Sequence, residues 1–272
     1  MVNLKGKRTL QREENNGLLF YRFPSLAACG EVVHGVFTRL GGVSRPPYHW
    51  LNVGRSVGDD QKAVDTNHDL ICRALGIHRG DIATAYQVHS ANVAVVGLED
   101  RGRVAFQTDA LVTNRPGVFL MLRFADCVPV ALYDPIRRAI GLVHAGWKGT
   151  LSQATRKTVE TMVEAYGSRP TDLIACIGPS IGPCCYQIGE NVVKLVSRVF
   201  PHQPQLLHQR RDGSCSFDLW EANRLQLAAL GVHQIEGSGL CTACHHDEFF
   251  SHRADHGRTG RFAVVMGLRG ED

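Results

Sequence analysis

The sequence predicts an α+β fold, a single domain in which mixed β-sheets are flanked by helices. Short apolar runs typical of strands dominate the first half of the chain, and helical patterns interrupt them without regular alternation. Regular alternation would instead favour a Rossmann-type parallel sheet. The length of 272 residues allows one large domain or two small ones. Because no linker rich in Pro, Gly or Ser divides the chain, we expect one domain.

The expected strands are rich in Val, Ile, Leu and Phe and are separated by Gly, Pro, Asn and Asp, the residues that punctuate strands. Several runs are almost continuously apolar, which indicates strands buried on both faces. The expected strands are residues 32–38, 82–89, 93–97, 118–124, 128–133, 139–143, 172–177 and 262–267.

The expected helices have apolar residues at helical spacing or clear end signals. The first follows the acidic pair Asp59–Asp60 and stops before Gly76, and the last ends before Gly231. The expected helices are residues 62–75, 149–166, 190–200 and 219–230.

Composition indicates a cytoplasmic protein without a nucleic-acid or membrane partner. The net charge is +4, but Lys and Arg are scattered among the acidic residues and no block of like charge appears. The first 17 residues are polar and lack the apolar core of a signal peptide. The longest apolar stretches, such as residues 118–122, are far shorter than the roughly 20 residues that cross a bilayer. Without an export signal, most of the nine cysteines are expected to be buried thiols.

Three segments each place a metal-binding side chain where a predicted strand ends. They contain His89, Cys127 and His144. Two imidazoles and a thiolate would leave the fourth position of a tetrahedral zinc open, as in catalytic zinc sites. Spacing alone does not establish this set, because His89 and Cys127 are too far apart for a local motif and a single buried His is usually a core residue.

Several longer motifs occur in a fixed order along the chain. They are HGVFTRLGGVS at residues 34–44, QVHS at 87–90, TDA at 108–110, ADCVPV at 125–130, HAGWKG at 144–149, IGPSIGPCCY at 177–186, CT at 241–242, FFSHR at 249–253 and TGR at 259–261. This series resembles the YfiH family, long called the laccase-domain or polyphenol oxidase family. The resemblance runs from about Phe20 to the C-terminus.

The resemblance implies an N-terminal extension over residues 1–19 and a YfiH-type catalytic domain over residues 20–272, with an architecture shared with cysteine-hydrolase-like folds. The zinc ligands of the family correspond to His89, Cys127 and His144. The implied reaction is zinc-dependent phosphorolysis of adenosine, guanosine, inosine and methylthioadenosine to the base and ribose 1-phosphate, with some adenosine deamination. One branch of the family is described as peptidoglycan editing factors.

Basic residues are candidates for binding phosphate. Arg39 lies in a Gly-rich loop after a predicted strand, and its guanidinium suits phosphate oxygens. A solvated loop arginine is the alternative. Lys148 could share the role, and Arg253 and Arg261 are weaker candidates.

Acidic, polar and aromatic residues beside the ligands have two interpretations each. Asp109 and Asp126 could orient a ligand histidine or act as general acid or base, or they could cap turns. Gln87 shares a strand face with His89 and could contact substrate. Phe37 or Trp147 could stack on a purine, or could instead belong to the core.

Other functions remain open from the sequence. A copper-dependent polyphenol oxidase could use the same ligands, but the chain has no His-x-His pair of the kind that multicopper oxidases need. A hydrolase editing a peptidoglycan precursor could use Cys127 as nucleophile, with His89 or His144 as base. A non-enzymatic binding protein is a third class. The preferred nucleoside, the native metal and the oligomeric state are left open.

A second zinc site is also suggested by Cys184–Cys185 and by the Cys-x-x-Cys run at residues 241–244. The first pair is adjacent in sequence, which suits binding of one ion poorly, so we expect free thiols there.

Overall fold

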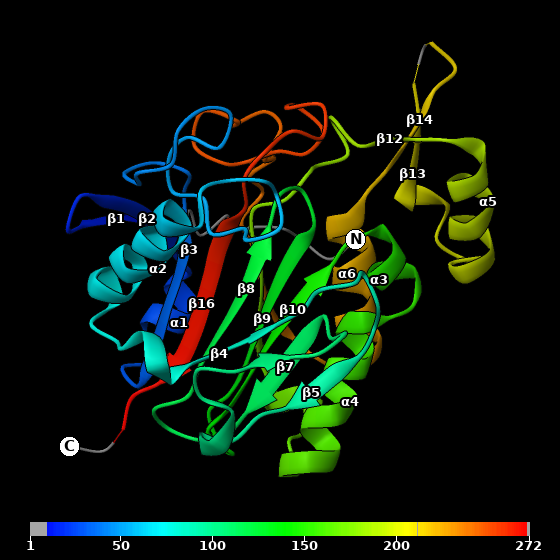
Figure 1. The fold of residues 1–272 in the computed structure, drawn as a ribbon. Coiled ribbons are helices and arrows are strands. Elements are labelled where there is room, and N and C mark those ends of the chain that lie inside the picture. Colours follow the sequence, from blue (N-terminus) through cyan, green and yellow to red (C-terminus); the bar gives the residue numbers. More distant parts are fainter. Residues whose placement is uncertain (1–9, 211, 271–272) are drawn as a thin grey trace.

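The computed structural model describes residues 10–210 and 212–270 and contains two large β-sheets and one small sheet (Figure 1). The seven-stranded sheet has the order β1 (Gln11–Asn15), β2 (Leu18–Arg22), β3 (Val32–Phe37), β16 (Phe262–Leu268), β8 (Phe119–Phe124), β4 (Ile82–Ala85) and β6 (Val104–Ala105). The six-stranded sheet has the order β15 (Gln234–Gly237), β11 (Ile174–Ile177), β9 (Val128–Asp134), β10 (Ala139–Ala145), β7 (Ala110–Thr113) and β5 (Val93–Val95). The small sheet joins β12 (Gln187–Ile188), β14 (Cys215–Phe217) and β13 (Leu207–Gln209).

The described residues contain six helices, α1 (Pro24–Ala27), α2 (Gln61–Leu75), α3 (Trp147–Leu151), α4 (Ala154–Tyr166), α5 (Glu190–Val199) and α6 (Leu219–Ala229). The outer face of the seven-stranded sheet is covered by α2, and that of the six-stranded sheet by α4 and α6. Both large sheets mix parallel and antiparallel pairs; β4 is parallel to β8, whereas β16 is antiparallel to it. The predicted α+β class with mixed sheets is therefore confirmed.

Three apolar clusters define four layers. The central cluster joins the facing sides of the two sheets, for example Leu120 of β8 and Leu142 of β10. A second cluster packs the other side of the six-stranded sheet against α4 and α6, and a third packs the other side of the seven-stranded sheet against α2. Every residue of β9, β10 and β16 is buried, as expected for strands covered on both faces.

Several predicted boundaries were wrong for local reasons. The expected helix at residues 149–166 is interrupted because Gln153 has a left-handed backbone (φ +61°), which separates α3 from α4. The strand expected at 82–89 ends at Ala85, and β11 begins at Ile174 because Pro170–Asp172 forms a 3₁₀ turn.

The segment predicted as an N-terminal extension contributes to the seven-stranded sheet. β1 and β2 form a hairpin through Asn16–Gly17, both with positive φ, and β2 pairs with β3. Residues 1–9 lie outside the described residues, and the domain boundary at residue 20 stays a prediction. The part of the chain that the structure describes contains no helix that is long and apolar enough to cross a membrane.

The two large sheets are joined by a link of three residues between β8 and β9. β8 ends at Phe124 in one sheet and β9 begins at Val128 in the other. The start of β9 pairs with the end of β10, where His144 lies opposite Pro129. This junction therefore brings Cys127 next to the end of β10.

Candidate metal centre

The three predicted ligands converge at this junction. The donor atoms of His89, Cys127 and His144 all lie within 4.8 Å of one another. Their side chains range from exposed (His89) through half-buried (Cys127) to buried (His144). The two imidazole rings are 5.0 Å apart between centroids and nearly perpendicular, at 69°. The fold thus assembles donors that are 55 residues apart in sequence, from His89 to His144.

The backbone leaves room for this group at Gly146, between β10 and α3. A Cβ atom at this position would lie 2.8 Å from the Cys127 sulfur and 3.1 Å from Cδ2 of His89. Side chains larger than hydrogen would therefore displace two of the three donors. This close approach explains why the HAGWKG motif has glycine at this position.

Asp109 anchors both histidines. Its carboxylate is fully buried, and Oδ1 accepts hydrogen bonds from the His89 N–H and from His144 Nδ1, each at 2.9 Å. Oδ2 accepts from the N–H groups of Val88 (3.1 Å) and Ser90 (2.7 Å) and from the Ser90 hydroxyl (2.8 Å). These bonds fix the loop in which His89 has a φ of +61°. They also place the His144 proton on Nδ1, which leaves Nε2 as the donor atom for a metal.

The electrostatics of the centre favour the charged forms of Asp109, Cys127 and His144. Burial raises the pKa of Asp109, but hydrogen bonds from His144 and Ser90 outweigh it and lower the pKa to about 2. Burial likewise opposes ionisation of Cys127, yet His144 and His89 lower the pKa of its thiol to about 6. Burial lowers the pKa of His144, and Cys127 and Asp109 raise it to about 9. The chain thus stabilises Cys127 as a thiolate, the form that binds metals.

These nitrogen and sulfur donors suit a borderline-soft metal ion such as zinc. Two imidazoles and one thiolate are common zinc ligands, and three protein ligands are typical of catalytic zinc. The space kept free by Gly146 and the orientation imposed by Asp109 are consistent with such an ion. The same donors can also bind copper.

Asp126 directly precedes Cys127, and its carboxylate binds Thr242 and Arg253 and not a ligand histidine. Its φ is +84°, Oδ1 accepts from the Thr242 hydroxyl at 2.6 Å, and Oδ2 accepts from the Arg253 N–H at 2.7 Å. Asp126 therefore fixes the β8–β9 link against the segment that precedes β16.

The predicted phosphate residue Arg39 is buried and already has several protein partners. It donates to the carbonyls of His49 (3.0 Å) and His246 (2.9 Å), lies 3.9 Å from an Asp255 carboxylate oxygen, and packs over the Phe250 ring. Its role in phosphate binding stays a prediction.

The other basic candidates differ in their surroundings. Lys148 is exposed and lies near Trp147, with 5.7 Å from Nζ to the ring centroid. Arg253 donates to the carbonyls of Cys185 and Gln187. Arg261 donates to the carbonyls of Thr259 (3.0 Å) and Gly260 (2.8 Å); burial lowers the pKa of its guanidinium, and the nearby Cys127 and Asp126 oppose this effect.

Two predicted substrate contacts are occupied by other partners. Both amide atoms of Gln87 bind the backbone of Arg123, at 2.9 and 3.0 Å. Phe37 is fully buried and packs against Phe20, 5.1 Å away between centroids, so its ring is not available to a purine.

Arg123 and Tyr186 were missed as neighbours of the site. Arg123 lies within β8, whose other residues are apolar, and nothing in the local pattern marks it. Tyr186 ends the IGPSIGPCCY motif, which could have identified it; its pKa is raised by burial and by Cys127.

Comparison with known proteins gives consistent results over most of the chain. Residues 33–269 match the family model described as multi-copper polyphenol oxidoreductase laccase. The chain is 39% identical to "Purine nucleoside phosphorylase YlmD" of Bacillus subtilis (strain 168), over 88% of this chain and 89% of that protein. It is similar to the crystal structure of YlmD from Geobacillus stearothermophilus, with a TM-score of 0.90 and 36% identity over 96% of this chain and 99% of that one. The crystal structure of the YfiH protein of Bacillus licheniformis gives a TM-score of 0.89, 36% identity and the same coverage.

Proposed function

The chain belongs to the YfiH family of laccase-domain proteins, and we propose that it is a zinc-dependent purine nucleoside phosphorylase. The observation that carries the proposal is the convergence of His89, Cys127 and His144 on a buried anchoring carboxylate, Asp109. The relatives named purine nucleoside phosphorylase indicate an enzyme acting on a small molecule. Zinc, the individual nucleosides and the deaminase side activity are part of the proposal.

In the proposed reaction, a phosphate oxygen forms a bond to C1′ of the ribose. The bond between C1′ and N9 of the purine breaks, and its electron pair leaves with the base, which gains a proton. The products are the free purine and ribose 1-phosphate. A zinc ion on His89, Cys127 and His144 would supply a Lewis acid for an oxygen of the substrates.

Arg261 is the residue that we propose for holding the phosphate. It is half-buried, burial lowers the pKa of its guanidinium, and Cys127 and Asp126 only partly offset this effect. Arg123 lies close enough for mutual repulsion, and burial, Arg55 and Arg261 lower its pKa to about 10. Poorly solvated positive charges of this kind are stabilised by a multiply charged anion. Arg39 stays the alternative predicted from the sequence.

A cysteine hydrolase is the second candidate, and one specific observation favours it. Cys127, His144 and Asp109 lie in the order nucleophile, base and orienting carboxylate, with 2.9 Å between His144 Nδ1 and Asp109. Such an enzyme would need Cys127 free of metal. Stoichiometric zinc together with resistance of Cys127 to alkylation would exclude this function.

The test is adenosine turnover by the purified zinc-loaded protein, with and without phosphate, with products separated by chromatography. Phosphate-dependent release of adenine that disappears in the Cys127→Ala variant is the expected result. Inosine as the main product, with or without phosphate, would identify a deaminase instead. Absence of any turnover in protein shown to contain zinc would contradict both activities and favour the cell-wall hydrolase. Repeating the assay with the copper-loaded protein and a phenolic substrate tests the oxidase.

A further inference from the structure

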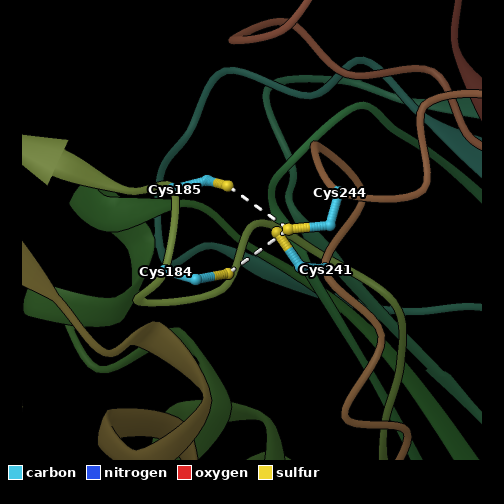
Figure 2. Close-up of side chains that lie close together, drawn as sticks. All are labelled: Cys184, Cys185, Cys241 and Cys244. Carbon is cyan, nitrogen blue, oxygen red and sulfur yellow. Dashed lines mark hydrogen bonds between the residues drawn. The ribbon is translucent and has the colours of Figure 1, made fainter.

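A second group of potential metal ligands lies apart from His89, Cys127 and His144. The sulfur atoms of Cys184, Cys185, Cys241 and Cys244 all lie within 4.8 Å of one another (Figure 2). Two of these cysteines lie between β11 and β12 and the other two between β15 and β16, so the group joins loops about 60 residues apart in sequence. We call these four residues the thiol cluster.

The spacing of the sulfur atoms fits a tetrahedral ion and does not fit disulfides. Cys184 and Cys185 lie 3.6 Å and 3.5 Å from the Cys244 sulfur. Four thiolates at about 2.3 Å from a zinc ion are about 3.8 Å from one another. A disulfide requires about 2.05 Å between sulfurs. Although adjacent in sequence, Cys184 and Cys185 both turn toward the other two side chains, which removes the objection raised by the sequence (Figure 2).

The backbone holds the two loops together around the thiol cluster. Ser180 donates its N–H to Leu240 (3.2 Å) and accepts from the Thr242 N–H (3.1 Å), and it forms an isolated bridge with Cys241. The Gly182 N–H donates to the Cys241 sulfur at 3.2 Å. Donation of a backbone N–H to sulfur stabilises a thiolate, and rigid backbone on both sides fixes the ligand positions.

Positive charge and solvent access complete the site. Zinc bound by four thiolates carries two net negative charges, and two guanidinium groups lie close by. Arg210 donates to the Cys184 carbonyl at 2.5 Å, and Arg253 donates to the Cys185 carbonyl at 3.1 Å. Cys184 and Cys244 are exposed, so an ion can enter without unfolding of the loops.

We propose that Cys184, Cys185, Cys241 and Cys244 bind a second zinc ion, as a closed tetrathiolate site that stabilises the fold. Four protein ligands leave no position for substrate, which is typical of structural zinc. The site ties the loop before β12 to the segment before β16. None of its four ligands belongs to the first centre.

The test is zinc content measured by mass spectrometry on protein purified under reducing conditions with zinc. The Cys127→Ala variant disables the first centre and is expected to retain one zinc ion per chain. Adding Cys244→Ser should abolish that zinc, whereas adding the matched control Cys29→Ser, a half-buried thiol outside both groups, should leave it. The proposal would be overturned if the Cys127→Ala protein contained no zinc, or if the Cys127→Ala, Cys244→Ser double variant still contained one zinc ion per chain.

A second measurement needs no change to the thiol cluster and so does not depend on folding of the Cys244→Ser variant. In the Cys127→Ala protein, the four cysteines should resist alkylation until a chelator is added, as peptide mass spectrometry can show. Cobalt in place of zinc should give the intense thiolate charge-transfer absorption of a tetrathiolate site. Immediate alkylation of all four thiols, or disulfides among them in the freshly purified protein, would refute the site.

Discussion

Replacing Asp109 by Asn tests the anchoring of the metal centre, because it changes one oxygen to an NH₂ group at the same size. The carboxylate accepts two hydrogen bonds at Oδ1, from the His89 N–H and His144, and three at Oδ2, from Val88 and Ser90. Whichever way the amide is turned, its NH₂ group faces at least two donors. If it faces His144, the imidazole proton must move to Nε2, the atom needed for the metal.

The expected magnitude follows from these contacts. Each buried donor left without an acceptor costs about 1–3 kcal/mol, so two of them should lower the free energy of unfolding by about 2–6 kcal/mol. Loss of the carboxylate behind a ligand histidine should weaken zinc binding about 10- to 100-fold. Urea unfolding and zinc competition with a chromophoric chelator measure the two effects.

Asp126→Asn is the matched control for these two measurements. Its carboxylate is also buried and next to a ligand, but an amide can keep both bonds, accepting from the Arg253 N–H and donating to the Thr242 hydroxyl. We expect less than about 1 kcal/mol of destabilisation from this change. Equal effects of the two substitutions, or unchanged zinc affinity in the Asp109→Asn protein, would refute the anchoring role of Asp109.

Three further predictions concern other residues. Burial lowers the pKa of His34 to about 3, so the folded state prefers the neutral ring, and stability present above pH 6.5 is lost as the pH falls toward 3. At pH 5 the free energy of unfolding should be about 2 kcal/mol lower than at neutral pH, and His34→Gln should not show this decrease. Equal pH dependence of urea unfolding in both proteins would contradict this prediction. Arg261→Ala should raise the KM for phosphate about tenfold or more, whereas Arg39→Ala should mainly lower stability; the reverse pattern would assign the phosphate to Arg39. Gly146→Ala should weaken zinc binding about tenfold with little loss of stability, because its Cβ would meet the Cys127 sulfur; unchanged affinity would show that the backbone yields there.

The elements that the sequence predicted well are those whose signals are local. Asp60 caps α2 by accepting from the Lys62 N–H at 3.1 Å, and Gly76 ends it with a φ of +66°. The apolar runs of β9, β10 and β16 similarly predict burial on both faces. The pairing of β16 with β3 and β8 was not predictable, because it joins segments more than 130 residues apart through backbone bonds that leave no sequence pattern.

The same distinction applies to the two cysteine-containing centres. Residue type and position at strand ends suggested His89, Cys127 and His144 as a ligand set, but only the family resemblance identified them as the zinc ligands. The family motifs include Cys184, Cys185 and Cys241 but implied no metal for them, and the rule that adjacent cysteines bind one ion poorly predicted free thiols instead of the zinc site that we propose. That rule considers one loop, whereas the geometry of Cys184 and Cys185 depends on a second loop that places Cys244 between them.

The two centres are linked through Asp126. This residue precedes Cys127, and its carboxylate binds Thr242, next to Cys241, and the N–H of Arg253. A zinc ion that orders the loop at Cys241 therefore also orders the link that carries Cys127. Linkage requires the effect to be reciprocal, so zinc at either centre should raise the affinity of the other by the same factor. Zinc titration of wild-type protein and of the Cys244→Ser variant measures this factor at the first centre. Equal affinities would show that Asp126 holds its place without the second ion.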